Sequence, residues 1–329
     1  MTIKKAELHT HLEGTIRPGL AKKLAARNKL SFPENRLTED GQSYVYRDFM
    51  EFLNTYDLIA GLIRKPEDYY DITFDYLQEN AAANAIYTEM MYSPDHAEKT
   101  SNIPSSEHLQ AIQQAIDDAE KKFNIIGRII ITGVRHFGVD AVTAVAKQSL
   151  KETVPCIVGF GLGGDEINYP PQLFINAYQI AAAGGLACTI HAAEFAPAST
   201  IVEAINSLPI KRIGHGVQAI LAPEVIKHLQ DHDIALELCP SSNICLNVFK
   251  NLPSHPFPKF MAAGVKISLN TDDPPFFRTN LAAEYQKVQQ AYLYTDQQME
   301  MITTMAIDVA FVDQPTKLKL KKRLGSIES

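Results

Sequence analysis

The sequence predicts a single (β/α)8 barrel that extends over residues 1–329. Short apolar runs alternate with stretches of helical periodicity along the chain, and polar residues follow the apolar runs. This alternation is typical of parallel strands connected by helices, and a closed barrel collects the side chains at the carboxyl ends of its strands on one face. The length alone would suggest two domains, but barrels of this size commonly form one. We find no internal repeat or low-complexity segment that would divide the chain.

Eight strands are predicted from short apolar runs. The clearest is Ile-Ile-Gly-Arg-Ile-Ile-Ile-Thr-Gly-Val at residues 125–134, because isoleucine favours an extended backbone. In chain order, the predicted strands cover residues 5–10, 85–92, 125–134, 156–162, 186–191, 212–215, 234–239 and 266–271.

The segments between these runs show helical spacing of their apolar residues. In residues 48–62, for example, Phe49, Phe52 and Tyr56 fall on one face of a helix. Gly184 and Gly185 follow another such segment and are typical of a helix end. Helices are predicted at residues 17–28, 48–62, 66–85, 106–123, 139–150, 171–183, 200–207, 223–232 and 257–263, and from residue 280 to the end.

Composition excludes several classes of partner and location. The net charge of −7 argues against a nucleic-acid partner, because neutralising phosphates requires a basic surface. No apolar run approaches the roughly 18 residues that a membrane span needs, and we expect no signal peptide. The four cysteines form no C-x-x-C pair, so we expect buried, reduced thiols in a cytoplasmic protein. The oligomeric state stays open.

The predicted metal ligands are His9, His11, His191 and Asp272. His9 and His11 are one residue apart at the end of the first strand, and side chains at i and i+2 of a strand point the same way. His191 and Asp272 follow the fifth and eighth strands, and the first and eighth strands are neighbours in a closed barrel. Histidine and carboxylate suit Zn²⁺, whose catalytic sites keep one position for water. Because the fourth strand carries no lysine to bridge two ions, we predict one Zn²⁺ per chain.

Glu194 and His215 are the predicted catalytic residues. Glu194 lies three positions after His191, where it could transfer a proton, and His215 on the neighbouring strand could orient or deprotonate a metal-bound water. Asp273, adjacent to Asp272, is expected to bond substrate. Taken singly, each residue has a simpler explanation, such as a buried core histidine or an aspartate that caps a helix. Their common position at strand ends favours a metal hydrolase, whereas His96, His108, His228 and His232 are expected on the surface.

Several motifs are similar to those of the adenosine deaminase family over nearly the whole chain. They are ELHTHLEGT at residues 7–15, GVRH at 133–136, GFGLGGDE at 159–166, HAAE at 191–194, RIGHG at 212–216, CPSSN at 239–243 and SLNTDDP at 268–274. The resemblance implies zinc on the four ligands above, protonation of the purine N1 by Glu194, and addition of hydroxide to C6 with help from His215. It also implies that Asp273 bonds N7, that the Gly164 backbone contacts N3, and that Phe49 and Phe52 wall the purine pocket.

The resemblance leads us to expect deamination of adenosine, and of 2′-deoxyadenosine, to inosine and ammonia, with a purine nucleoside as the small-molecule partner. Three departures, at Glu13, Ala193 and Met91, bear on this expectation. Met91 replaces an Arg that is frequent in the family before Tyr-Ser-Pro, which bears on a supporting ion pair rather than on the chemistry. Glu13 stands where the family usually has an Asp that reaches the ribose, and Glu is common in relatives that act on free adenine or larger nucleosides. Gly214, in contrast, resembles the nucleoside enzymes. Ala193 replaces the usual glycine, which we expect to restrict the backbone to conformations that do not need glycine.

Two alternatives remain open from the sequence. One is the same chemistry on free adenine or on a modified adenine nucleoside such as aminodeoxyfutalosine. The other is a non-catalytic binding protein, which is disfavoured because every predicted ligand and Glu194 are present.

Overall fold

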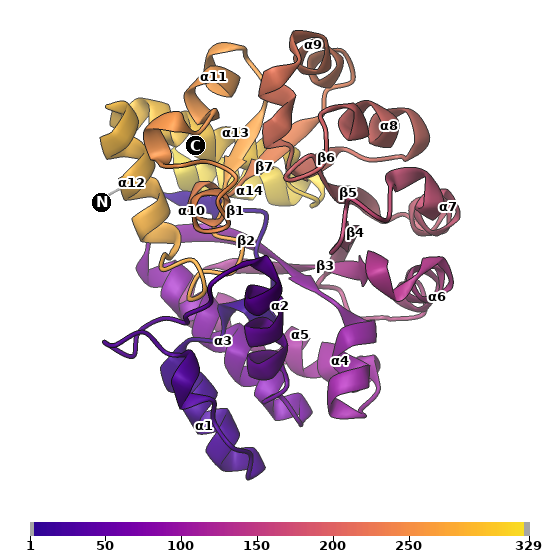
Figure 1. The fold of residues 1–329 in the computed structure, drawn as a ribbon, viewed down its shortest axis with the longest axis vertical. Coiled ribbons are helices and arrows are strands. Elements are labelled where there is room, and N and C mark those ends of the chain that lie inside the picture. The colour runs from indigo at the N-terminus through magenta and orange to yellow at the C-terminus, as the bar shows by residue number, and fades with distance from the viewer. Residues whose placement is uncertain (1–2, 326–329) are drawn as a thin grey trace.

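The computed structural model describes residues 3–325, and within this range eight parallel strands follow one another around a barrel in chain order, from β1 to β8 (Figure 1). The predicted fold is therefore confirmed, with most boundaries shifted by one or two residues. The strands are β1 (Lys5–Glu7), β2 (Ala85–Tyr92), β3 (Ile126–Val134), β4 (Ile157–Gly163), β5 (Ala187–Ala192), β6 (Arg212–His215), β7 (Ala235–Leu238) and β8 (Ile267–Leu269).

The barrel closes between its first and last strands just beyond their carboxyl ends. Thr10 and Asp272 form an isolated parallel bridge, in which the His11 amide donates to the Asp272 carbonyl at 3.0 Å. The Asp272 amide in turn donates to the His9 carbonyl at 3.2 Å. Strand β1 is shorter than predicted, but these bonds keep the backbone extended as far as His11. The alternation of side chains that the prediction used therefore still applies.

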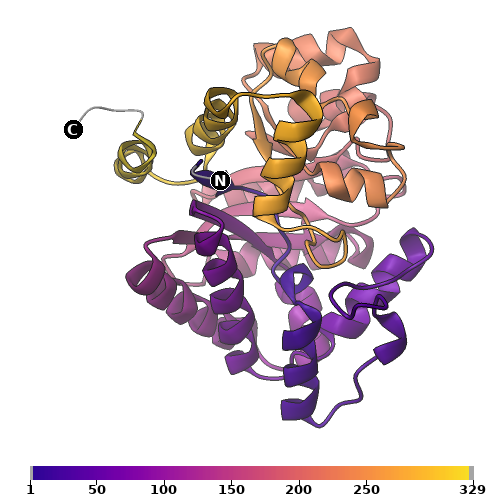
Figure 2. The same ribbon diagram turned by 90° about the vertical axis from the view of Figure 1, so that its left-hand side faces the viewer.

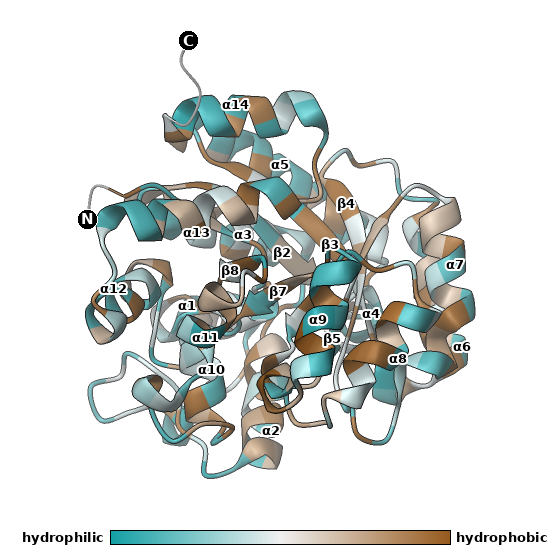
Figure 3. Ribbon diagram, turned by 90° about the horizontal axis from the view of Figure 1, so that it is seen from above, coloured by the Kyte–Doolittle hydropathy of each residue, from teal (hydrophilic) through white to brown (hydrophobic). Residues whose placement is uncertain are grey.

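Helices surround the barrel on its outside, as Figures 1 and 2 show. In Figure 3 the strands β3 and β4 are largely hydrophobic, whereas helices such as α9 and α14 show hydrophilic turns. The helices are α1 (Pro18–Asn28), α2 (Phe49–Ala60), α3 (Pro66–Ala82), α4 (Pro94–Ser101), α5 (Ser105–Phe123), α6 (Val139–Ser149), α7 (Ile175–Ala183), α8 (Ser199–Ser207), α9 (Pro223–Asp231), α10 (Pro240–Cys245), α11 (Phe257–Ala262), α12 (Leu281–Tyr292), α13 (Asp296–Val309) and α14 (Gln314–Leu324).

The C-terminal part is divided into α12, α13 and α14, where the sequence predicted continuous helix. The Thr295 hydroxyl accepts from the Gln298 amide, and the Asp313 carboxylate accepts from the Thr316 amide, so each residue caps the start of a new helix. Residues 326–329, which the prediction also made helical, lie outside the described residues. None of the helices within residues 3–325 is both long enough and apolar enough to cross a membrane.

Charged side chains fill the interior of the barrel near its amino-terminal end. The Arg212 guanidinium is fully buried, and it pairs with Glu89 at 2.5 Å and with Glu237 at 2.6 Å. The ring of Phe311, from the link between α13 and α14, lies 3.5 Å from the guanidinium carbon. Buried charges of this kind are tolerated only when they are paired and hydrogen-bonded. The C-terminal segment therefore covers an ion-pair network as well as apolar residues.

His108 is buried, and its predicted surface position is wrong. It lies on the face of α5 that also buries Leu109 and Ile112, because positions three and four apart share a helix face. One ring nitrogen lies 3.0 Å from the Tyr92 hydroxyl and the other 3.2 Å from the Ser101 hydroxyl. The prediction of buried, reduced cysteines is confirmed for three of the four. All four are free, with Cys156, Cys188 and Cys239 buried and Cys245 half-buried.

Burial of His108 predicts a pH dependence of stability. Desolvation lowers the pKa of His108 to about 4, whereas an unfolded histidine titrates near 6.5. Between these values the unfolded chain binds more protons, so the free energy of unfolding decreases as the pH falls from about 6.5 toward 4. In H108Q this decrease should be smaller, as measured by urea unfolding at a series of pH values. H232Q, at an exposed position, is the control, and an unchanged pH dependence in H108Q would contradict the assignment.

Candidate metal centre and active site

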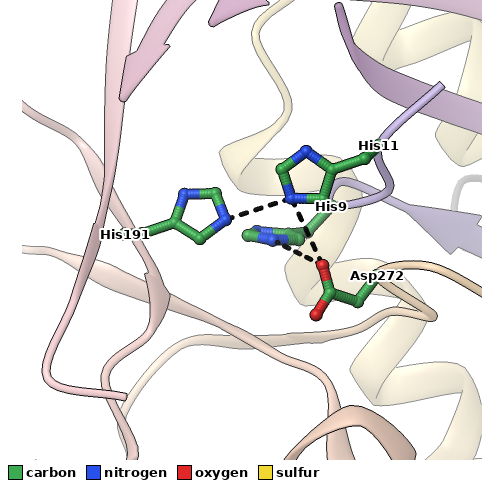
Figure 4. A group of neighbouring side chains, drawn as sticks. All are labelled: His9, His11, His191 and Asp272. Carbon is green, nitrogen blue, oxygen red and sulfur yellow. Dashed lines mark hydrogen bonds and ion pairs between the residues drawn. The ribbon is translucent and has the colours of Figure 1, made fainter. Parts of the chain in front are cut away.

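His9, His11, His191 and Asp272 meet at the carboxyl end of the barrel (Figure 4). The Nε2 atoms of His11 and His191 are 3.2 Å apart, and the Asp272 Oδ1 atom lies 3.3 Å from His11 Nε2 and 3.5 Å from His9 Nε2. His9, His191 and Asp272 are buried. One ligand atom from each residue is thus within 4.8 Å of the others, which is a buried metal site.

The ring nitrogens that do not face the site are held by other groups. His9 Nδ1 is 2.7 Å from Glu237 Oε2, and Glu237 in turn bonds Arg212 and the Thr189 hydroxyl. His191 Nδ1 is 3.0 Å from the Leu162 carbonyl. Such partners fix the tautomer of a metal-ligating histidine and leave Nε2 free for the ion.

The donor set fits a divalent metal ion. The buried His9 Nε2 has no hydrogen-bond partner among residues 3–325, and an unsatisfied buried nitrogen is costly unless something binds it. Three imidazoles and one carboxylate match the preferences of Zn²⁺, Ni²⁺ or Cu²⁺ better than those of Mg²⁺ or Ca²⁺.

Glu194 and His215 lie beside this cluster. Glu194 Oε1 accepts from the Asn243 amide nitrogen at 2.8 Å and lies 3.5 Å from His215 Nδ1. Asn243 is itself held by His255, whose Nε2 is 3.1 Å from the Asn243 oxygen. Burial, followed by the negative charges of Asp272 and Glu166, raises the pKa of Glu194 well above its usual range. Burial lowers the pKa of His215 to about 3, which keeps its ring neutral.

A cavity of about 360 Å³ opens above the metal ligands. Phe49 and Phe52 of α2 line one side, and Gly164 lines another, in the left-handed backbone conformation with φ +96°. A side chain at Gly164 would approach His136 Nδ1 within 2.7 Å, so glycine is needed there. Asp273 also lines the cavity, and its buried Oδ1 has no partner within residues 3–325. Burial and the adjacent Asp272 raise the pKa of Asp273.

Several cavity residues were missed by the sequence analysis. His96 was expected on the surface but lines the cavity, 3.0 Å from Asp57 of α2. Asn243, which bonds Glu194 but is not among the described residues that line the cavity, was part of a matching motif and received no role. The sequence offered little indication of its role, because a helix as short as α10 shows no periodic pattern that would place a polar residue on one face. Phe195, His136 and Glu166 also line the cavity.

The structure places Glu13 and Gly214, the two residues on which the expected substrate depended, away from the cavity lining. The buried Glu13 accepts from the Tyr69 hydroxyl at 3.0 Å and is not among the described residues that line the cavity. A side chain at Gly214 would lie 2.7 Å from His9 Cε1. Gly214 therefore makes room for a metal ligand, and it is not among the described residues that line the cavity.

Strained backbone surrounds the site. Ala193, His215 and Asp272 all have positive φ values, of 55°, 60° and 64°. The expectation that Ala193 would avoid such conformations is wrong, because the chain turns sharply between His191 and Glu194. Non-glycine residues in this region cost about 1–3 kcal/mol each and are held by surrounding contacts.

The strain at Ala193 can be measured by substitution. We expect A193G to raise the free energy of unfolding by about 1 kcal/mol, because glycine adopts positive φ without a steric penalty. A192G is the matched control, since Ala192 is the last residue of β5 and lies outside the left-handed region. It should instead lower the free energy of unfolding by about 0.5–1 kcal/mol. Equal destabilisation in both variants, measured by urea unfolding, would show that Ala193 is unstrained.

Comparison with known proteins agrees with this geometry. The model of the adenosine deaminase family matches residues 4–327. An adenine deaminase of Rhizobium rhizogenes is 39% identical over 322 residues, which cover 98% of this chain and 99% of that protein. The solved structure of adenine deaminase from Arthrobacter aurescens has a TM-score of 0.89 at 28% identity and covers 98% of both chains.

A second solved structure bears on the metal. It is an amidohydrolase from Burkhoderia ambifaria with bound zinc, with a TM-score of 0.88 at 25% identity, covering 99% of this chain and 90% of that one. On the match to its model and on these full-length similarities, this chain belongs to the adenosine deaminase family of hydrolytic deaminases.

Proposed function

We propose that this chain, as one catalytic domain, hydrolyses adenine to hypoxanthine and ammonia with one Zn²⁺ held by His9, His11, His191 and Asp272. The observation that carries the proposal is the buried Nε2 of His9, which has no hydrogen-bond partner within residues 3–325 and lies within this four-residue cluster, at the base of a cavity next to Glu194. A zinc ion held there would acidify a water molecule and so supply the nucleophile at neutral pH.

The residues of the chain have complementary tasks in this reaction. Glu194, buried and with a raised pKa, is suited to hold a proton for the purine N1. Neutral His215, whose Nδ1 atom lies 3.5 Å from Glu194 Oε1, can accept a proton from the attacking water. Ammonia leaves from C6 after the exocyclic nitrogen gains a proton, so that one water is consumed for each ammonia released.

The remaining residues orient the base. The Asp273 Oδ1 atom has no hydrogen-bond partner in the described part of the chain and suits the purine N7, since a raised pKa lets the carboxyl group carry a proton and donate it in a hydrogen bond. Gly164 would offer its backbone to N3. Phe49 and Phe52 supply aromatic surface for stacking, which favours a planar purine.

Free adenine is preferred over adenosine as the substrate, which reverses the order given by the sequence. The adenine deaminases from Rhizobium rhizogenes and Arthrobacter aurescens match this chain along its whole length. Moreover, neither Gly214 nor Glu13 is among the described residues that line the cavity, since Gly214 lies beside the His9 ring and Glu13 bonds Tyr69. Adenosine stays the second candidate, because a cavity of about 360 Å³ leaves space beyond a purine base.

The substrate is tested by ammonia release from adenine, adenosine, 2′-deoxyadenosine and aminodeoxyfutalosine in parallel, with and without a zinc chelator. We expect kcat/KM for adenine to exceed that for the nucleosides by at least about tenfold, a difference of roughly 1.4 kcal/mol in transition-state binding. Chelation should abolish turnover, and added zinc should restore it. A preference for adenosine would keep the chemistry and overturn the choice of substrate.

Two substitutions separate proton transfer from metal binding. We expect E194Q to retain its zinc and to lose about a hundredfold to ten-thousandfold in kcat, because it removes a group that moves a proton. D272A should lose both zinc and activity, because it removes a ligand. Zinc is measured by elemental analysis of the purified proteins. Full zinc content in D272A, or normal turnover in E194Q, would contradict the respective role.

A further inference from the structure

The last two residues of β5 and the turn that follows them, residues 191–196, carry both His191 and Glu194, and we refer to this segment as the β5 turn. It contains the strained Ala193, so local backbone preferences do not favour its shape. Its backbone groups are instead held by three polar side chains from the segments that follow β3, β4 and β6. Arg135 and Gln218 have no role in the proposed chemistry, and Glu166 enters it only through its negative charge near Glu194.

The first of the three is Arg135, at the end of β3. It is almost fully buried, and its Nη2 atom donates to the His191 carbonyl at 2.7 Å. Its Nη1 atom donates to the Tyr169 carbonyl at 3.4 Å. A buried guanidinium is costly to desolvate, and hydrogen bonds from a charged donor are stronger than those between neutral groups. Arg135 therefore anchors the start of the β5 turn.

Glu166 and Gln218 hold the rest of the turn. The buried Glu166 carboxylate accepts from the Phe195 amide and, at 2.9 Å, from the Ala196 amide. The Gln218 amide nitrogen of the backbone donates to the Ala193 carbonyl at 3.0 Å, and its side chain donates to the Glu194 carbonyl at 2.8 Å. Contacts thus lie on both sides of Glu194 along the chain.

We propose that Arg135, Glu166 and Gln218 are positioning residues that brace the β5 turn and thereby aim the Glu194 carboxyl group at the substrate. They act on the backbone of residues 191–196 and, through it, on Glu194. Without the brace, Ala193 can relax to negative φ, which rotates the following residue. A displacement of about 1 Å at a reacting group is sufficient to slow a reaction by about a hundredfold. This inference rests on the proposed function, because it assigns the proton transfer to Glu194.

The main test is E166Q, which keeps the shape of the side chain but removes the charge that strengthens its two hydrogen bonds. We expect kcat for adenine to fall by about tenfold to a hundredfold, with less than about a threefold change in KM and unchanged zinc content. Q218A removes only the side-chain bond to the Glu194 carbonyl, so a smaller decrease of about threefold is expected. E203Q is the control, because Glu203 accepts from Gln172 on the exposed side of α8.

A double variant shows whether Glu166 acts through Glu194. Residues that act as a unit are strongly non-additive, so E166Q in an E194Q background should leave the residual rate unchanged. If the double variant is slower than E194Q by the same factor that separates E166Q from the wild type, Glu166 acts elsewhere and the proposal is wrong. An unchanged kcat in E166Q would also overturn it.

Hydrogen exchange tests the brace independently of the substrate. In the zinc-loaded protein, E166Q should speed exchange of the Phe195 and Ala196 amides, which donate to Glu166, while exchange in α5 stays the same. This measurement needs no turnover. If the wild type does not deaminate adenine but E166Q shows faster exchange of these amides, only the proposed substrate is contradicted. Unchanged exchange in E166Q would contradict the brace.

Discussion

The contact that closes the barrel is the constraint on which the site depends. The backbone of His9 and His11 bonds the backbone of Asp272, and the side chains of the same three residues converge on one point. Closure of the barrel therefore brings three of the four metal ligands together. A small error in the register between β1 and β8 would separate the ligands, because one residue of slip turns a side chain to the opposite face. His191 then adds a ligand from the opposite side of the barrel.

Buried charges connect this point to the far end of the barrel. His9 bonds Glu237, Glu237 bonds Arg212, and Arg212 bonds Glu89 and lies against Phe311. Each charged group in this network pairs with the next one. Removing one of them would therefore leave an unpaired charge in the interior. The orientation of a metal ligand thus depends on the segment between α13 and α14, which is distant from the cavity.

The sequence predicted the barrel and the metal cluster because both depend on regular patterns. Strands and helices alternate, and His9, His11, His191 and Asp272 all follow apolar runs. Arg135, Glu166, Gln218 and Asn243 could not be assigned in the same way, because their partners are backbone atoms or single side chains far away in the sequence. The conformation of Ala193 was also beyond prediction, since tertiary contacts override the local preference of alanine. The sequence could not explain why position 214 is a glycine. The structure explains it, because a side chain there would collide with the His9 ring.

The distance along the chain between the two halves of the metal centre has a consequence for biosynthesis. Thr10 and the Asp272 carbonyl that it bonds are 262 positions apart, so the ribosome adds all the residues between them before the last ligand emerges. Until then the nascent chain has three of the four ligands, and β1 lacks its contact with the segment after β8. Contacts with such large sequence separation form late and slowly. An ion that binds the finished cluster would then stabilise the closed barrel by mass action, so supply of zinc during expression should affect the yield of folded protein as well as its activity.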